Sequence, residues 1–209
     1  MSRFYHRLAF KKYPWIISFD LSNQIDDELN DKLLEQCIKS DDEHRHTLAE
    51  DTYNTKLDNT DEMKILYNLF VKVCHIFFTN IPEECLLEKQ GRRSQAAYVS
   101  YGKRRYDSYW HNHCNRATIN SVYYVSVPDK GGTLSVMLDN GEDREIKVKE
   151  KEMILMPGWL THKPNPCEDE YPRASINMEF LSDTRAVLKP DNFDIEEYKL
   201  FGKGGFILW

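Results

Sequence analysis

WHNHCNRATINSVYYV, residues 110–125, places two histidines shortly before a run of β-branched and aromatic residues. Alternate residues of an extended chain face the same side, so His111 and His113 are expected to point together into the interior of a β structure. Neutral imidazole is a good ligand for iron or zinc. The stretch therefore predicts two metal ligands beside a buried strand.

A third histidine, His162, follows the sequence MPGWLT at residues 156–161. A strand ending in a tight turn at the Pro-Gly pair would bring His162 back beside the first two, so three imidazoles from two distant segments would hold one metal ion. The His-x-His spacing alone is a weak signal, because HRH at residues 44–46 has it too, in an acidic segment expected to lie in solvent. The alternative for His111 and His113 is a pair of hydrogen-bonded core histidines.

The last strand-like run, RASINMEF at residues 173–180, alternates between polar and apolar residues. Arg173, Ser175, Asn177 and Glu179 share one face, and so polar a face within a core region predicts a wet pocket. Arg173 offers a planar fork for bidentate binding of a carboxylate, and Ser175 adds a hydroxyl on the same side. The alternative for Arg173 is a structural ion pair with Glu179 or with a loop carboxylate.

Short, alternating runs of strand-forming residues surround these three segments. Strands are predicted at residues 96–101, 118–127, 133–138, 144–148, 153–156 and 173–180. Turn signals separate the runs, among them Pro128–Gly132, Asp139–Gly141 and Pro157–Gly158. Many short strands at this spacing are typical of a barrel or a sandwich.

Two amphipathic helices are predicted before the strands. One spans residues 21–38 with Ser22 as its capping residue, and the other starts at Asp61 and is ended by Asn80-Ile81-Pro82. The second helix has an apolar stripe that includes Ile65. The polar connection at residues 39–60 is expected to be long and exposed, and is a candidate lid.

Composition narrows the class of protein. The 209 residues are 41% hydrophobic and 12% aromatic, which predicts a globular fold. The net charge of −6 argues against nucleic acid as a partner. No apolar stretch is long enough for a membrane span or a signal peptide, which predicts a cytoplasmic protein. Five cysteines without a CxxC pair are expected to be reduced thiols.

The order of these features resembles the iron(II)- and 2-oxoglutarate-dependent oxygenases, especially the small bacterial and phage-type members near the prolyl hydroxylases. The resemblance covers roughly residues 95–180. It rests on HNH at 111–113, SVYYV at 121–125, Pro128 with GGTL at 131–134, MPGWLTH at 156–162 and RASIN at 173–177.

The resemblance implies that His111 and His162 bind Fe(II), that Arg173 holds the distal carboxylate of 2-oxoglutarate, and that Tyr98 contacts this cosubstrate. It also implies hydroxylation of an amino-acid or peptidyl substrate by O2, with succinate and CO2 as co-products. The implied fold is mainly β with flanking helices: a double-stranded β-helix of the jelly-roll or cupin type. We expect one domain of residues 1–209, with a helical support region at 1–90, the β-helix at 91–182 and a tail at 183–209.

One position departs from the resembled family, which has Asp or Glu two residues after the first histidine. Here that position is His113, and direct metal ligation by His113 is the favoured interpretation. Asp107 or Glu179 are alternative sources of the carboxylate. A non-standard ligand set also fits a halogenase-like oxygenase, and a hypothesis of another class is a catalytically silent, cupin-like module that binds a metal and a carboxylate.

Overall fold

The computed structural model describes residues 5–10, 13–44, 57, 60–80, 86–88, 97–101, 110–113, 119–137, 141–167, 173–180 and 185–187. Two helices lie within them, α1 (Asp27–His44) and α2 (Asp61–Asn80). The strands in the same ranges are β1 (Tyr5–Phe10), β2 (Tyr13–Asp20), β3 (Leu86–Glu88), β4 (Ala97–Tyr101), β5 (Ile119–Ser126), β6 (Leu134–Met137), β7 (Asp143–Ile146), β8 (Glu152–Pro157), β9 (His162–Pro164), β10 (Ala174–Phe180) and β11 (Arg185–Val187).

A six-stranded antiparallel sheet forms the centre of the protein, with the strand order β1-β2-β8-β5-β10-β4. Strand β5 is buried along its whole length, with β8 on one side and β10 on the other. Hydrogen bonding on both edges and burial on both faces explain why its sequence is a nearly continuous run of strand-forming residues.

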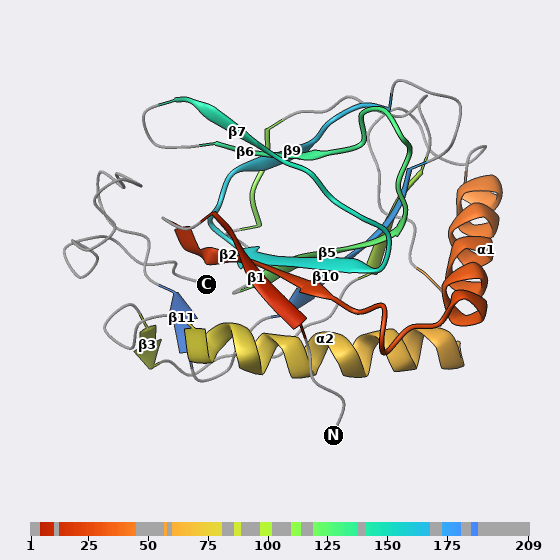
Figure 1. Ribbon diagram of the computed structural model, residues 1–209, viewed down its shortest axis with the longest axis horizontal. Coiled ribbons are helices and arrows are strands. Elements are labelled where there is room, and N and C mark those ends of the chain that lie inside the picture. The colour runs from red at the N-terminus through yellow and green to blue at the C-terminus, as the bar shows by residue number, and fades with distance from the viewer. Residues whose placement is uncertain are drawn as a thin grey trace.

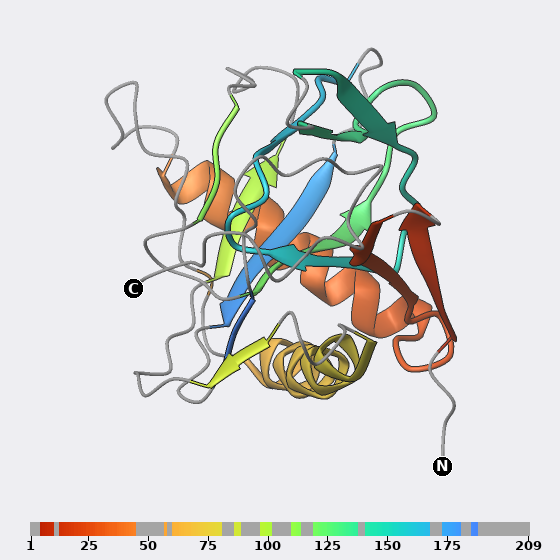
Figure 2. The same ribbon diagram turned by 90° about the vertical axis from the view of Figure 1, so that its left-hand side faces the viewer.

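A second, three-stranded sheet of order β7-β6-β9 lies over one face of the six-stranded sheet, while α2 lies on the other side (Figures 1 and 2). A small two-stranded sheet pairs β3 with β11. The arrangement confirms a mainly β core with flanking helices. The narrower description as a double-stranded β-helix stays a prediction.

The register assigns the two faces of β5. Tyr123 faces the helices, because its hydroxyl donates to Asn30 Oδ1 of α1 at 2.8 Å, and Asn30 Nδ2 donates to the carbonyl of Val125 at 2.9 Å. Since successive side chains of a strand alternate, Asn120 and Tyr124 face the second sheet. This face of β5 therefore lines the interior between the two sheets.

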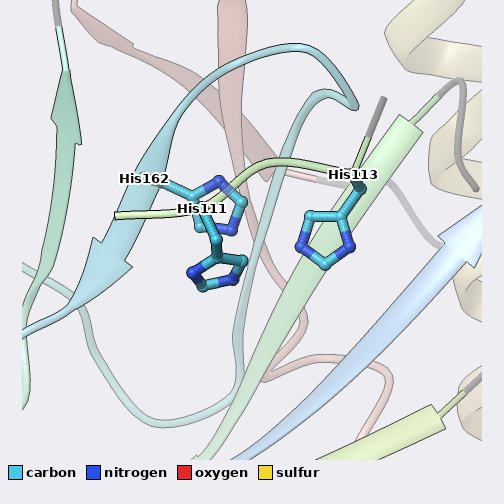
Figure 3. A group of neighbouring side chains, drawn as sticks. All are labelled: His111, His113 and His162. Atoms are coloured by element: carbon cyan, nitrogen blue, oxygen red, sulfur yellow. The ribbon is translucent and has the colours of Figure 1, made fainter. Parts of the chain in front are cut away.

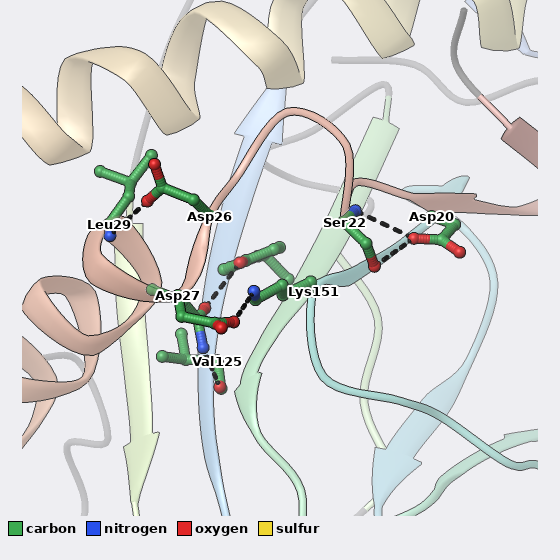
Figure 4. A network of polar contacts seen from close by, with 9 residues as sticks. Asp20, Ser22, Asp26, Asp27, Leu29, Val125 and Lys151 are labelled. Carbon is green, nitrogen blue, oxygen red and sulfur yellow. Dashed lines mark hydrogen bonds and ion pairs between the residues drawn. The ribbon is translucent and has the colours of Figure 1, made fainter.

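The start of α1 differs from the prediction. The helix begins at Asp27, and the carboxylate of Asp26 accepts a hydrogen bond from the Leu29 amide at 2.9 Å, so Asp26 is the capping residue (Figure 4). Ser22 instead donates through its amide and its hydroxyl to Asp20 Oδ1, at 2.9 and 2.6 Å. The prediction of a Ser22 cap was wrong because Ser22 belongs to the turn after β2.

The helical description of residues 1–90 was wrong in part. Strands β1 and β2 precede the helices, and β2 pairs with β8 in the main sheet. Ile16, Ile17 and Phe19 of β2 are fully buried, so this segment has no alternating pattern that would have identified it as a strand.

Helix α2 spans Asp61–Asn80, so it starts at the predicted residue and ends at the predicted Asn80-Ile81-Pro82 signal, but Ile65 is 45% exposed rather than part of the buried stripe. The part of the expected lid at residues 39–44 is the end of α1, and most of the remainder lies outside the described residues. None of the helices in the described ranges has the length and apolar character needed to cross a membrane.

The six predicted strands correspond to β4, β5, β6, β7, β8 and β10, with ends that differ by at most two residues. The three-residue strands β3, β9 and β11 were not predicted. Cys37, Cys74 and Cys167 are buried free thiols, as expected. Burial raises the pKa of Cys37 to about 12, so this thiol stays protonated at neutral pH.

Candidate metal centre

Main-chain hydrogen bonds bring the two histidine segments together. His111 and His162 form an antiparallel bridge, with N–H to carbonyl distances of 3.0 and 2.9 Å. The His113 amide donates to the carbonyl of Gly158 at 2.7 Å. Residues 111–113 therefore lie along the turn that leads into β9, as the Pro-Gly signal before His162 predicted.

The three predicted ligands form one cluster, shown in Figure 3. One ligand atom from each of His111, His113 and His162 lies within 4.8 Å of the others. The ring centroids are 4.6 Å apart for His111 and His162, 5.2 Å for His113 and His162, and 5.3 Å for His111 and His113. His113 and His162 are each 3% exposed, whereas His111 is half-buried.

The surroundings of His162 place a lone pair on its ring nitrogen Nε2, which Asn120 Nδ2 approaches at 3.2 Å. Its Nδ1 is 2.8 Å from the carbonyl of Leu160, which can only accept, so Nδ1 carries the proton and Nε2 carries a lone pair. Burial, together with the neighbouring His113 and His111, holds the pKa of His162 well below its usual value. The imidazole is therefore neutral at neutral pH, which is the form that binds metals.

His113 has the same arrangement with a stronger partner. Its Nδ1 lies 2.5 Å from Glu179 Oε1, and since a carboxylate accepts, Nδ1 donates and Nε2 carries the lone pair. Figure 3 shows one nitrogen of this ring turned toward His111 and His162. That Nε2 is buried and has no hydrogen-bond partner among the described residues.

The donor set fits a metal ion. A buried acceptor without a partner costs roughly 1–3 kcal/mol, and a bound cation at His113 Nε2 would remove that cost. Three imidazole nitrogens suit iron or zinc. Because imidazole binds a metal in its neutral form, three histidine ligands would not offset any of the metal's charge.

Glu179 and Asp107 were the alternative sources of a carboxylate ligand. Glu179 does not belong to the cluster of ligand atoms but lies on the far side of His113, bound to Nδ1. Asp107 lies outside the described residues. The structure thus brings together the favoured set, His111, His113 and His162.

Arg173 and Ser175 are both in the interior, 1% and 3% exposed. Arg173 Nε donates to the carbonyl of Gly132 at 2.9 Å, and its Cζ lies 5.2 Å from the ring centroid of Tyr124. Ser175 is directly opposite Tyr124 in the β5–β10 ladder, so the two residues share the interior face. A buried arginine beside a hydroxyl fits the predicted carboxylate site.

Gly132 is required at the turn that holds Arg173. Its φ is +67°, and a Cβ there would lie 2.9 Å from Pro128 Cγ and 3.2 Å from Arg173 Cδ. Any larger residue would push against the arginine side chain. The Gly-Gly pair, which the sequence indicated only as a turn, therefore also positions Arg173.

Two residues of β5 lie near the site, and the first of them, Asn120, was not singled out by sequence reasoning. Asn120 Nδ2 lies 3.2 Å from His162 Nε2, and Tyr124 packs on Arg173. An asparagine within a buried strand was the available signal for the first. Tyr98 is in β4, opposite Asn177 of β10, but its side chain is outside the described residues.

Solved structures of known enzymes share this fold. A prolyl-4-hydroxylase from Pseudomonas putida matches with a TM-score of 0.55 and 11% identity, over 87% of this chain and 86% of that one. The viral collagen prolyl hydroxylase of Paramecium Bursaria Chlorella virus-1 matches with a TM-score of 0.51 and 15% identity, over 83% and 90% of the two chains. The non-heme α-ketoglutarate-dependent carbocyclase SnoK, from nogalamycin biosynthesis, has a TM-score of 0.56 and 8% identity, over 90% and 97%.

The likeness to these structures is one of fold, since the identities are low. No protein-family model matches the sequence, and no curated protein is detectably similar to it. The protein therefore has a mainly antiparallel β fold like that of prolyl hydroxylases and non-heme α-ketoglutarate-dependent enzymes, where α-ketoglutarate is 2-oxoglutarate. Within that fold it has a cluster of three histidines able to hold a metal.

Proposed function

We propose that this protein is an Fe(II)- and 2-oxoglutarate-dependent dioxygenase that hydroxylates an amino-acid or peptidyl substrate, with succinate and CO2 as co-products. The observation that carries the proposal is the cluster of His111, His113 and His162, whose ligand atoms lie within 4.8 Å of one another inside a fold shared with prolyl hydroxylases. Residues 91–182 would then form a double-stranded β-helix within a single domain of residues 1–209.

Each part of the interior face has a role in this proposal. The three histidines would hold Fe(II), and the bound metal with 2-oxoglutarate would supply the oxygen chemistry that side chains lack. Arg173 and Ser175 would bind the far carboxylate of 2-oxoglutarate, with Tyr98 as a further contact. Burial of His113 and His162 would keep water from the reacting atoms.

The substrate class follows from the neighbours' names alone and is an analogy. Two neighbours are named as prolyl hydroxylases, one of them a collagen prolyl hydroxylase, whereas SnoK is a carbocyclase from nogalamycin biosynthesis. A halogenase-like reaction in which His113 does not bind the metal and leaves one ligand position vacant is less favoured, because the ligand atoms of His113 and the other two histidines lie within 4.8 Å of one another. A silent metal- and carboxylate-binding module is the remaining alternative, and turnover separates it from an oxygenase.

The test is an anaerobic Fe(II) titration with and without 2-oxoglutarate, followed by admission of O2 and quantification of succinate. We expect one Fe(II) per chain, a change in the metal's spectrum when 2-oxoglutarate is added, and succinate formation that requires both. The His75→Ala variant is a matched control, because His75 is an exposed histidine on α2 outside the cluster.

Two results would count against the proposal. Stoichiometric binding of iron and 2-oxoglutarate with no succinate, across a panel of peptide and amino-acid substrates, would favour the silent module. Succinate formation that is unaffected by removing Fe(II) would exclude the metal from the reaction.

A further inference from the structure

The buried carboxylate of Glu179 contacts His113, the histidine at the position where the resembled family has Asp or Glu. Glu179 is 2% exposed, and its Oε1 is 2.5 Å from Nδ1 of His113, which is itself 3% exposed. An ionised carboxylate in the interior is unfavourable unless a hydrogen bond or an opposite charge compensates it. The position of Glu179 therefore calls for a reason beyond packing.

The strand register places Glu179 beside the other contact to the cluster. Glu179 is directly opposite Asn120 in the β10–β5 ladder, and Asn120 Nδ2 is 3.2 Å from His162 Nε2. The side chains of these two paired residues thus contact two of the three histidines, His113 and His162. Asn120 lies at the nitrogen of His162 that would bind a metal, whereas Glu179 lies at the nitrogen of His113 that would not.

The hydrogen bond to Glu179 selects one form of the His113 ring. A carboxylate accepts only, so it keeps the proton on Nδ1 and leaves the lone pair on Nε2, the buried nitrogen without a hydrogen-bond partner among the described residues. Carboxylate-to-histidine contacts of this kind orient metal-bound histidines and raise their basicity, and losing one typically weakens metal binding about 10- to 100-fold.

The charge of the ligand set also points to a role for Glu179 at the metal centre. A cluster of three neutral imidazoles has one negative charge fewer than the usual set of two histidines and a carboxylate. A carboxylate at Glu179 would place that charge outside the ligand set, behind His113, which it contacts at Nδ1.

We propose that Glu179 is a positioning residue for the metal centre, which fixes His113 with Nε2 toward the metal and replaces the missing carboxylate from outside the ligand set. The inference rests on the metal site of the proposed function, but it does not depend on which reaction the site performs. It also implies that residues 113 and 179 work as a pair, so changes at the two positions are not independent.

The experiment measures metal binding without 2-oxoglutarate or O2, using Co(II) as a spectroscopic probe and Fe(II) under anaerobic conditions. Glu179→Leu removes the hydrogen bond and the charge, and is expected to weaken Co(II) binding about 10- to 100-fold. Glu179→Gln keeps an acceptor for Nδ1 without the charge, so a smaller loss is expected. In ¹⁵N spectra of the metal-free protein, His113 should remain in the Nδ1–H form in Glu179→Gln and become a mixture of forms in Glu179→Leu.

Glu152→Gln is the matched control. Glu152 is another buried glutamate in the same sheet, 5% exposed, and it accepts hydrogen bonds from the Ser18 hydroxyl and the Lys149 amide. Its replacement is expected to lower stability while leaving Co(II) affinity and the His113 ¹⁵N signals unchanged, which separates positioning from a general effect of losing a buried carboxylate.

A double-mutant cycle keeps the inference testable if Glu179→Leu does not fold. His113→Asp would place a second carboxylate beside Glu179, so the repulsion should be relieved in His113→Asp with Glu179→Gln. We expect this double variant to bind Co(II) more tightly than His113→Asp alone.

Three outcomes are informative. Wild-type Co(II) affinity in folded Glu179→Leu, or strictly additive effects in the cycle, would overturn the inference. A wild-type protein that binds no metal would overturn it together with the proposed metal centre. A wild-type protein that binds metal but forms no succinate would contradict the proposed oxygenase alone, because the predicted ranking of the Glu179 variants would still hold.

Discussion

The interior face of the β5–β10 pair has two ends with different chemistry. At one end, Asn120 and Glu179 contact two histidines of the cluster, and at the other, Ser175 and Tyr124 lie beside the permanently charged Arg173. The ends are four residues apart along each strand, about 13 Å at roughly 3.3 Å per residue. One end suits a cation, and the other suits the carboxylate of a ligand that extends from it.

The two ends are also held in different ways. Main-chain hydrogen bonds between residues 111–113 and residues 158–162 fix the histidine end, so its geometry depends on backbone pairing. A contact from a side chain to the carbonyl of Gly132 fixes the arginine end. Substitutions at the histidine end should therefore affect metal binding with little effect on the fold, whereas at the arginine end a change in the turn at Gly132 should move the Arg173 side chain.

Replacing His162 should give the largest effect. His162→Ala removes one of three ligands from a site held by backbone contacts, so tight metal binding is expected to be lost while the fold survives. Metal content after anaerobic loading and the circular dichroism spectrum check this. An iron-replete, folded His162→Ala protein would remove His162 from the metal site.

Changes at His113 should come next and discriminate between ligand types. His113→Gly removes a ligand and is expected to weaken Fe(II) binding severely. His113→Asp restores a set of two histidines and one carboxylate, so its loss should be milder, although Glu179 opposes it. The expected order of affinity is wild type, then Asp, then Gly.

The control for this series is Asn112→Asp, which adds a carboxylate at an exposed position one residue away. It should leave Fe(II) affinity near the wild-type value. Wild-type affinity in His113→Gly would show that His113 is not a ligand, and attention would return to Asp107.

Arg173→Leu should weaken 2-oxoglutarate binding at the arginine end without changing Fe(II) affinity. Removing a buried, charge-assisted contact costs about 2 to 5 kcal/mol, so the 2-oxoglutarate requirement should rise roughly 30-fold or more while Fe(II) affinity holds. Arg144→Leu is the control, because Arg144 is an exposed arginine on β7. An unchanged 2-oxoglutarate affinity in Arg173→Leu would assign Arg173 a structural role.

Gly132→Ala should have the smallest effect of these variants on ligand binding. It tests whether the turn at Gly132 positions Arg173. Gly141→Ala is matched to it: φ is +67° at Gly132 and +81° at Gly141, but a Cβ at Gly141 meets nothing within 4 Å. Each variant should lose about 1–3 kcal/mol of stability from backbone strain, measured by urea unfolding. Only Gly132→Ala should also raise the 2-oxoglutarate requirement, and equal effects of the two variants would argue against a positioning role for Gly132.

The sequence predicted the histidine end more fully than its surroundings. His111, His113 and His162 were identified because strand parity and a Pro-Gly turn are local signals. Glu179 was placed on the correct strand face, yet its hydrogen bond to His113 joins residues 66 positions apart, a pairing that local patterns do not report. Strand β2 was missed because a strand buried on both faces does not alternate, and the choice between Ser22 and Asp26 as the cap of α1 depended on where the turn after β2 ended.

The most direct test of the metal centre is an anaerobic crystal structure of the Fe(II)-loaded protein with anomalous data at the iron edge. We predict one iron peak within bonding distance of a ring nitrogen from each of His111, His113 and His162, with the Glu179 carboxylate still on Nδ1 of His113. An iron peak elsewhere, or iron bound by Glu179 while His113 is turned away, would contradict the three-histidine site.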